Sequence, residues 1–317
     1  MLSLLSHIAA VFAGLALLIW SADKFVEGAA AMAHLLGVSV MIIGITIVGF
    51  GTSAPEIVVS IVAVLQDTPD IAIGNALGSN IANIGLILGV TAILAPIPIA
   101  TRLFKAEYPL LMIATALMSW SLFDLTLDVV DGFALFGFLL LSLHYLVREH
   151  RRNPAAYARE EHEPEEMIHD MKMPAAIGWL LLGLALLVGS SKLLVWGASN
   201  IAQTLGVSEL IIGLTIIALG PSLPELAASI VSLKKGKPDL AIGNVIGSNM
   251  FNLFMVMGLT GIIFPFSLSN KLLLRDLPVM IGFTLALVAI LRNAKGTDRW
   301  HGLLFFAAYS IYCFSLL

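Results

Sequence analysis

The sequence predicts an all-α membrane protein with ten transmembrane helices. They form two inverted five-helix repeats, each with a helix broken at a motif proline. Three observations predict this fold. Hydrophobic residues make up 59% of the 317 residues and charged residues only 12%, about half the share of an ordinary soluble domain. Ten apolar stretches are long enough to cross a bilayer, and the two halves of the chain repeat each other.

Composition and charge also exclude several classes of function. A net charge of −4 offers no basic surface for nucleic acid, so no such partner is expected. The single cysteine, Cys313, excludes an internal disulfide and a cysteine metal cluster. The apolar stretches contain no Ser/His/Asp, His-Glu-x-x-His or cysteine nucleophile arrangement. We therefore expect neither an enzyme nor a cofactor, and the lipid bilayer is the only surrounding that the sequence implies.

Crossing the hydrocarbon core takes about 20 apolar residues in a helix. The first stretch contains Asp23, Lys24 and Glu27, which a signal-peptide core would not, so it is interpreted as a retained helix. We interpret these three charges as a local structural ion pair. The predicted spans are 8–33, 40–65, 71–94, 106–123, 129–147, 175–200, 208–233, 239–264, 276–292 and 300–316.

A charged segment divides the chain between the fifth and sixth spans. Residues 148–172 hold twelve charged residues, which predicts a solvated linker at 149–174. The first repeat is then 1–148 and the second is 175–317. Loops on the linker's face hold thirteen Lys and Arg, and loops on the other face hold two. Because positive loops stay inside, the linker is predicted to be cytoplasmic and both termini outside.

The two halves match at an offset of 169 residues. The 26 residues from Gly37 share 15 identities with those from Gly206. A second block, from Ile71, matches the block from Leu240, with Gly, Ser and Asn at equivalent places. Five spans per half is an odd number, so the second half must insert upside down relative to the first. Inverted repeats with interrupted helices are typical of secondary transporters.

Two glutamates lie deep inside predicted spans at equivalent positions, Glu56 and Glu225. An acidic residue at mid-bilayer costs about 2.5–3.5 kcal/mol, so it persists only if it is paired or binds something. One interpretation is an ion pair with Lys24 or Lys192, but those lysines do not align with each other at the repeat offset. The other interpretation is a pair of ligands for a transported cation.

Each glutamate ends a motif that disrupts a helix. The motifs are Gly51-Thr52-Ser53-Ala54-Pro55-Glu56 and Gly220-Pro221-Ser222-Leu223-Pro224-Glu225. Proline frees a carbonyl one turn back and glycine lets the backbone open. A broken helix presents carbonyls, hydroxyls and a carboxylate at one depth, and these oxygen ligands suit hard cations such as Ca²⁺ or Na⁺. A simple proline kink is the alternative.

Polar stripes follow on the third and eighth spans. Their members are four residues apart and therefore share a helix face. They could bind ions or join helices. Ligation is favoured for Ser79, Asn83, Ser248 and Asn252, and helix-to-helix hydrogen bonding for Asn75, Asn80, Asn244 and Asn249.

The paired motifs, each followed by Gly-Asn-x-x-Gly-Ser-Asn, resemble the alpha repeats of sodium/calcium exchangers of the calcium/cation antiporter superfamily. The chain is most similar to the short bacterial inner-membrane type, and the resemblance covers essentially all of it. It implies location in the inner (plasma) membrane and a four-site ion cluster between the second, third, seventh and eighth helices. It also implies that the first and sixth helices slide to alternate access.

The resemblance implies a set of ion ligands in this sequence. They are Glu56, Glu225, Thr52, Ser53, Ser222, Ser79, Ser248, Asn83 and the backbone carbonyls of Gly49 and Ala218. Two positions depart from the family pattern. Pro221 replaces a threonine, so only its carbonyl is left to bind an ion, and Asn252 stands where an aspartate is common. The site then has two carboxylates rather than three.

These features predict an antiporter that exports Ca²⁺ in exchange for Na⁺ at one central site. The two glutamates supply a charge that matches one Ca²⁺, and Na⁺ ions compete for the same oxygens. A Ca²⁺/H⁺ or other cation/H⁺ antiporter is the alternative on the same scaffold. A cation channel is a more distant one, because two unlike halves that meet at one pair of acids are typical of an occluding site.

Overall fold

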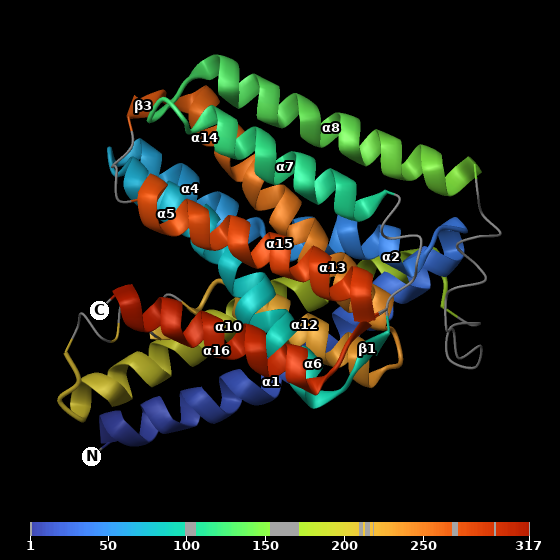
Figure 1. The fold of residues 1–317 in the computed structure, drawn as a ribbon. Coiled ribbons are helices and arrows are strands. Elements are labelled where there is room, and N and C mark those ends of the chain that lie inside the picture. The colour runs from blue at the N-terminus through green and yellow to red at the C-terminus, as the bar shows by residue number, and fades with distance from the viewer. Residues whose placement is uncertain are drawn as a thin grey trace.

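Figure 1 shows a computed structural model that is almost entirely helical. The residues that it describes are 2–98, 106–152, 171–208, 212, 216–217, 219–267, 272–294 and 296–316. Ala218 and most of the predicted linker lie outside them. Besides helices, the described chain has two short antiparallel strand pairs, β1 with β4 and β2 with β3.

The first half begins with a long helix and continues through two helices with π-helical segments, labelled η. Its elements are α1 (Leu2–Leu36), α2 (Val40–Ile43), η1 (Gly44–Val48), α3 (Gly49–Thr52), α4 (Ala54–Leu65), α5 (Pro69–Ala82), η2 (Asn83–Leu88), α6 (Gly89–Leu94), β1 (Ile97–Pro98), α7 (Glu107–Ser121), β2 (Thr126–Leu127) and α8 (Val129–Arg152).

The second half follows the same order. Its described elements are α10 (Met173–Thr204), α12 (Leu223–Lys234), α13 (Pro238–Phe251), η5 (Asn252–Val256), α14 (Met257–Ile263), β3 (Phe266–Ser267), η6 (Leu272–Asp276), α15 (Leu277–Ala294), β4 (Gly296–Thr297) and α16 (Arg299–Leu316). The long helices of the two halves end in the same way. Gly37 and Gly206 follow α1 and α10 with φ of 63° and 83°, a left-handed helix ending that favours glycine.

Six helices of the described chain are long and apolar enough to cross a membrane. There are up to seven if Val40–Thr52 and Ala54–Leu65, bent by 42°, form one span. The chain is therefore a multi-pass helical membrane protein. Three predicted spans, 106–123, 208–233 and 300–316, are not in this count, and the first two fall short for identifiable reasons. The 15 residues of α7 extend only about 22 Å, less than the ~30 Å hydrocarbon core, and the span 208–233 is only partly described.

The surface of the molecule carries large apolar side chains that a soluble protein would bury. Trp120, Phe123, Trp300 and Phe314 are each more than three-quarters exposed. Aromatic rings of this size at the ends of apolar helices are typical of the membrane surface. The exposed face is therefore one that lipid covers.

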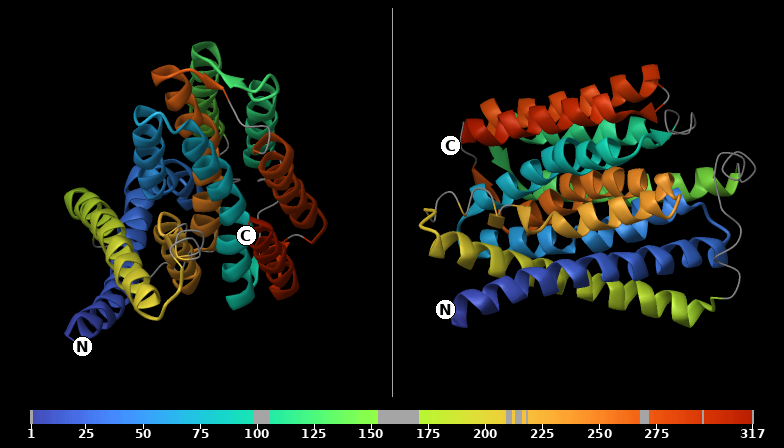
Figure 2. Two further views of the ribbon diagram at one scale, coloured as in Figure 1. Left: turned by 90° about the vertical axis from the view of Figure 1, so that its left-hand side faces the viewer. Right: turned by 90° about the horizontal axis from the view of Figure 1, so that it is seen from below.

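Helices α1 and α10 pack against each other in antiparallel directions (Figure 2). Glycine makes the close approach possible. A side chain at Gly14 would collide with the backbone of Leu194, and one at Gly183 would collide with the backbone of Phe25. At the repeat offset of 169, Gly14 corresponds to Gly183 and Leu194 corresponds to Phe25. Each contact is therefore the equivalent of the other, and the two helices are related by an approximate two-fold axis.

A similar correspondence, in which the two glycines are 170 residues apart and their contact partners 169, relates contacts elsewhere. A side chain at Gly132 on α8 would meet α14, and one at Gly302 on α16 would meet the corresponding part of α6. The start of α1 and the end of α16 lie at one end of the molecule, while α8 ends and α10 begins at the opposite end (Figures 1 and 2). The arrangement places α3, α4, α5, α12 and α13 in the middle of the bundle.

Candidate cation-binding site

Each glutamate motif lies at a helix start in the middle of the bundle. In the first half, α3 ends at Thr52 and α4 begins at Ala54, with Ser53 between them. In the second half, α12 begins directly after Ser222. The prolines that follow occupy the first turn, where the missing amide proton costs no helical hydrogen bond. Glu56 and Glu225 therefore also lie in a first turn, where the helix dipole favours negative charge.

The two carboxylates are buried and lie close enough to interact electrostatically. Glu56 and Glu225 are each 1% exposed, and the charge of one is felt by the other. Both carboxylate oxygens of Glu56, and Oε2 of Glu225, have no hydrogen-bond partner in the part of the chain that the structure describes. A buried, unpaired charge is costly, so these oxygens require a cation or protons.

Neither lysine of the alternative interpretation supplies that cation. The Lys24 ammonium donates to Glu27 Oε2 at 2.8 Å and lies 4.0 Å from Asp23. The local pair expected from the sequence is thus confirmed. Lys192 is exposed on α10 and makes no ion pair with any described residue. Neither lysine therefore pairs with a buried glutamate.

Oxygen atoms from both halves converge beside Thr52. The Thr52 hydroxyl donates to Asn244 Oδ1 at 3.0 Å and lies 3.3 Å from the Ser248 hydroxyl. Ser248 in turn donates to the backbone carbonyl of Gly49 at 3.4 Å. Three predicted ligands, Gly49, Thr52 and Ser248, are therefore brought into contact. Their hydroxyl and carbonyl oxygens form one small polar cluster at the interface between the halves.

Two asparagines tie the neighbouring helices to the glutamate backbones. Asn75 Nδ2 donates to the carbonyl of Glu56 at 3.1 Å and to the Ser60 hydroxyl at 2.9 Å. At the equivalent place, Asn244 Nδ2 donates to the carbonyl of Glu225 at 3.3 Å. The predicted role of these asparagines in joining helices is confirmed. Each amide fixes a helix that carries a carboxylate.

The other asparagines differ between the halves. Asn83 donates to Asn249 Oδ1 at 2.9 Å, and Asn80 donates to a carbonyl of its own helix at 2.9 Å. Asn252 is 1% exposed, yet neither of its polar atoms has a partner among the described residues. Asn83 Oδ1 is also unpartnered. Buried polar atoms nearly always find partners, so these oxygens are candidates to bind an ion or water.

The remaining predicted ligands make no hydrogen bond to the Thr52 cluster or to the carboxylates within the described residues. Ser53 is fully buried and its hydroxyl has no hydrogen-bond partner within the described chain. Ser79 and Ser222 are buried on α5 and at the start of α12, but no hydrogen bond to either carboxylate joins them within the described ranges. The expected carbonyl ligand at Ala218 lies outside the described residues.

A cavity of 410 Å³ lies directly beside the motifs. It lies between α10, α4 and the start of α12, and its wall includes Pro55, Pro221 and Pro224. Within that wall, Ser191 of α10 donates to the carbonyl of Gly220 at 2.6 Å, so α10 contacts the segment before α12 directly. Pro221 thus borders this cavity.

The donor set decides which ions suit the site. The described residues contain no group of three His, Cys, Asp or Glu placed to hold a metal. Ligands here are two carboxylates together with hydroxyl, amide and carbonyl oxygens, which suit hard cations and lack the nitrogen or sulfur that transition metals prefer. Two carboxylates balance one divalent ion, and the neutral oxygens can also surround monovalent ions.

Sequence reasoning missed Ser60 and Ser229. Each lies four residues after a motif glutamate and accepts a hydrogen bond from the asparagine beside that glutamate's carbonyl. The signal was available, since both serines fall within the aligned 26-residue block at the same offset. It was overlooked because a serine inside a helix more often bonds to its own backbone.

Comparison with known proteins fits this geometry. A family profile described as "Sodium/calcium exchanger protein" matches residues 6–148 and, separately, residues 175–317. The chain belongs to the sodium/calcium exchanger family. It is a transporter of the calcium/cation antiporter superfamily, and each half matches the same profile alone. The independent match of each half agrees with the repeat seen in the sequence.

Individual relatives extend along nearly the whole chain. The "Putative antiporter CaxA" of Alkalimonas amylolytica is 45% identical over 309 residues, covering 96% of this chain and 97% of its own. The "Inner membrane protein YrbG" of Escherichia coli K12 is 37% identical, covering 86% of this exchanger and 85% of its own length. A solved structure of the sodium-calcium exchanger NCX_Mj superimposes with a TM-score of 0.83 at 30% identity, covering 99% of this chain and 100% of NCX_Mj.

Proposed function

We propose that this exchanger is a secondary active antiporter that exports Ca²⁺ in exchange for Na⁺ at a site built on Glu56 and Glu225. One observation carries the proposal: two buried carboxylates have oxygens without partners beside a cluster of neutral oxygens from both halves. The names of relatives support the choice of ions, since NCX_Mj is described as a sodium-calcium exchanger.

Competition at one site couples the two flows. The carboxylates of Glu56 and Glu225 balance the charge of one Ca²⁺, while Na⁺ ions bind the same oxygens together with hydroxyls such as those of Thr52 and Ser53. The site is exposed to one face at a time by alternating access. With three Na⁺ entering for each Ca²⁺, one net charge moves inward, and the membrane potential adds about 2.3 kcal/mol per 100 mV.

The proposed architecture has ten spans in two inverted repeats, 1–148 and 175–317. The linker 149–174 lies in the cytoplasm and both termini lie outside the inner membrane. Support comes from the exchanged contacts of α1 with α10 and from the shared end of the molecule at which α1 starts and α16 stops. It also comes from the excess of Lys and Arg in loops on the linker's face.

Cysteine labelling tests this topology. In a Cys313→Ser background, a cysteine placed within 155–165 should react with a membrane-impermeant reagent only from the cytoplasmic face. A cysteine appended after Leu317 should react only from the outside. The expectation follows from positive loops remaining inside. Labelling of the appended cysteine from the cytoplasm would refute the ten-span, inverted arrangement.

A proton-coupled antiporter is the second candidate. The same two glutamates could exchange protons for Ca²⁺. The buried hydroxyls of Thr52, Ser53 and Ser222 favour Na⁺, because a proton needs no such surrounding oxygens. A cation channel fits less well, since the two carboxylates are 1% exposed and so lie in no open pore of the described structure.

Transport into inside-out vesicles distinguishes the candidates. Ca²⁺ uptake should require an imposed Na⁺ gradient, with Na⁺ higher inside the vesicle, the face that corresponds to the cell exterior. A K⁺ gradient or a proton gradient imposed alone should not drive uptake. Uptake driven by a proton gradient without Na⁺ would replace the proposal with the Ca²⁺/H⁺ antiporter. Unitary currents in a planar bilayer would indicate a channel.

Pro221→Thr should raise the apparent affinity for Na⁺. Thr52, its counterpart in the first half, offers a hydroxyl that the ring of Pro221 lacks, and that ring stiffens the segment before α12. A recovered polar contact contributes about 1–3 kcal/mol, whereas Ca²⁺ relies on carboxylates and carbonyls that are already present. Half-maximal inhibition of Ca²⁺ uptake should therefore need less Na⁺ in the variant.

Pro221→Ala is the matched control, because it removes the ring without adding a hydroxyl. Its Na⁺ inhibition should stay near that of the unmodified protein. An equal shift in both variants would assign the effect to backbone flexibility, and no shift in Pro221→Thr would contradict a Na⁺ ligand at this position.

A further inference from the structure

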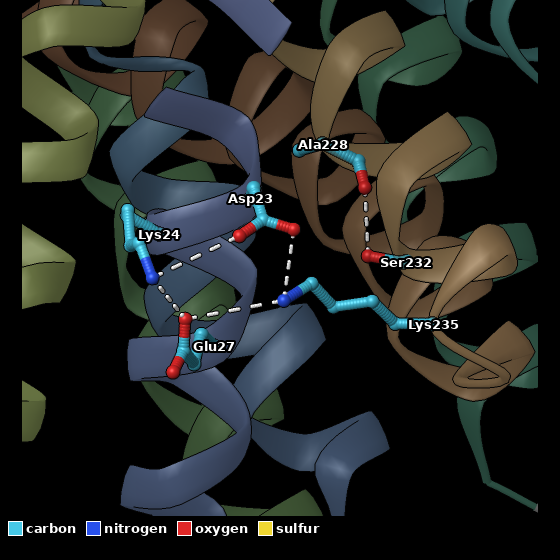
Figure 3. Close-up of polar contacts among 6 residues, drawn as sticks. All are labelled: Asp23, Lys24, Glu27, Ala228, Ser232 and Lys235. Atoms are coloured by element: carbon cyan, nitrogen blue, oxygen red, sulfur yellow. Dashed lines mark hydrogen bonds and ion pairs between the residues drawn. The ribbon is translucent and has the colours of Figure 1, made fainter. Parts of the chain in front are cut away.

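Four charged side chains link α1 to the end of α12 (Figure 3). The Lys235 ammonium lies 2.9 Å from Asp23 and 3.9 Å from Glu27. Lys24 completes the cluster through its contacts with the same two acids on α1. Two acids and two lysines leave no net charge, which lowers the cost of placing them along apolar helices. We call the contacts of Lys235 with Asp23 and Glu27 the α1–α12 ion link.

The link acts on the helix that carries a site carboxylate. Glu225 lies in the first turn of α12, and Lys235 follows its last residue, so the 12-residue helix connects them as one rigid rod. Ser232, two residues before the end of that helix, bonds to its own helix at Ala228 rather than to α1. Lys24 also lies 5.3 Å from the ring of Trp179 on α10, so the cluster contacts all three helices.

The equivalent place in the other half carries no such link. At the offset of 169, Asp23 corresponds to Lys192 and Lys235 corresponds to Gln66. Neither Lys192 nor Gln66 forms an ion pair with a described residue, and both are exposed. Here Lys192 of α10 and Val59 of α4 both line the 410 Å³ cavity. The ion link therefore joins α12 to α1, whereas a cavity lies at the equivalent place between α4 and α10.

We infer that Asp23 and Lys235 are positioning residues: their ion pair holds α12 against α1 at this end of the bundle and thereby favours the conformation in which the cavity between α4 and α10 is open. This inference rests on the proposed antiport by alternating access. For the site to open toward the end of the bundle at which the α1–α12 ion link lies, the link has to separate. Lys235 therefore sets the balance between the two states, although it touches no transported ion.

Removing the link should shift the population toward the state with the cavity closed. The four side chains are 21–41% exposed, so the link is a partly hydrated one. Ion pairs of this kind shift an equilibrium by about two- to fivefold. Lys235→Gln and Asp23→Asn should each reduce the open-cavity population by such a factor.

Thiol labelling of the cavity measures that population directly. Asn200 lines the cavity, and its side-chain hydrogen bond to the Trp196 carbonyl is exposed, so Asn200→Cys in a Cys313→Ser background reports access. We expect an anionic methanethiosulfonate added at the face of the termini to label this cysteine about two- to fivefold more slowly when Lys235→Gln is present. Labelling is done without Na⁺ or Ca²⁺.

Matched variants separate positioning from general damage. Lys234→Gln removes a neighbouring exposed lysine that has no partner among the described residues, and it should leave the labelling rate unchanged. Lys235→Arg keeps the charge and should restore the rate. Gln66→Glu gives Lys192 an acid at the equivalent place on the open side, so it should slow labelling. Gln66→Lys, which repels Lys192, should not.

The outcomes are distinguishable from those that test the proposed function. Unchanged labelling in both Lys235→Gln and Asp23→Asn would overturn the inference, as would equal slowing by Lys234→Gln. Because labelling needs no ion gradient, these results stand whichever ions are exchanged. Conversely, uptake driven only by protons would refute Na⁺ coupling and leave the labelling result in place. A variant that elutes as aggregate is replaced by Lys235→Met at the same position.

Discussion

Glu56→Gln is expected to abolish Ca²⁺ exchange, and Glu225→Gln is expected to do the same. Each change removes one of the two negative charges that balance a divalent ion, in a site where both side chains are 1% exposed. Loss of one partner from a buried charge pair costs about 2–5 kcal/mol, which corresponds to a loss of at least about 30-fold in Ca²⁺ affinity. Uptake should fall to the level of vesicles without the exchanger.

Folding should survive these substitutions. Glutamine has nearly the same shape, and a neutral amide costs less to bury than an unpaired carboxylate. Asp67→Asn is the matched control, since Asp67 is an exposed acid of the same half at φ 59°, a conformation that asparagine tolerates. Near-normal Ca²⁺ uptake by either glutamine variant, measured with radioactive Ca²⁺ in vesicles, would exclude the proposed site.

Gly247→Ala is expected to impair transport almost as strongly. The added Cβ would collide with the carbonyl oxygen of Ile45 and would lie 2.7 Å from its Cα, so α13 and η1 must separate. That separation stretches the 3.0 Å contact between Thr52 and Asn244. Misplacement by about 1 Å reduces the activity of a preorganised site by about 100-fold, and overpacking costs about 1–3 kcal/mol of stability.

Gly78→Ala is the counterpart at the repeat offset. Among the described residues nothing lies within 4 Å of a Cβ at that position, so its thermal midpoint should match that of the unmodified exchanger. For Gly247→Ala we expect a lower midpoint together with reduced Ca²⁺ uptake. Equal midpoints in the two variants would show that the contact between α13 and η1 tolerates a methyl group.

Local chemistry made much of the central region predictable from the sequence. Pro55 and Pro224 mark helix starts because of their missing amide proton, and the structure begins α4 and α12 beside them. Helix joining was predicted for Asn75 and Asn244, and both bond to glutamate carbonyls. The prediction was wrong for Asn80, which bonds within its own helix, whereas Asn83, predicted as an ion ligand, bonds to Asn249. The ligand roles of Ser79, Ser222 and Asn252 stay predictions.

Contacts between the two halves of the chain could not be predicted from the sequence. Lys24 and Glu27 are three residues apart on one helix, so their pairing was predictable, whereas Lys235 joins Asp23 from the opposite half of the chain. Alignment at a fixed offset suggests two equivalent sites. It does not show that Thr52 reaches across to Asn244 or that Pro221 borders a cavity instead. Such differences arise from how the helices pack and not from local pattern.

The antiparallel pairing of α1 with α10 has a consequence for biosynthesis. Residues such as Gly14 and Phe25 contact a helix that is translated about 170 residues later, a delay of roughly 10–30 s at ordinary rates of elongation. Throughout that interval the first helix is in the membrane without its partner, and Asp23 lacks Lys235. Until the second half arrives, the first helix therefore holds two acids and one lysine, so one negative charge along it is not compensated.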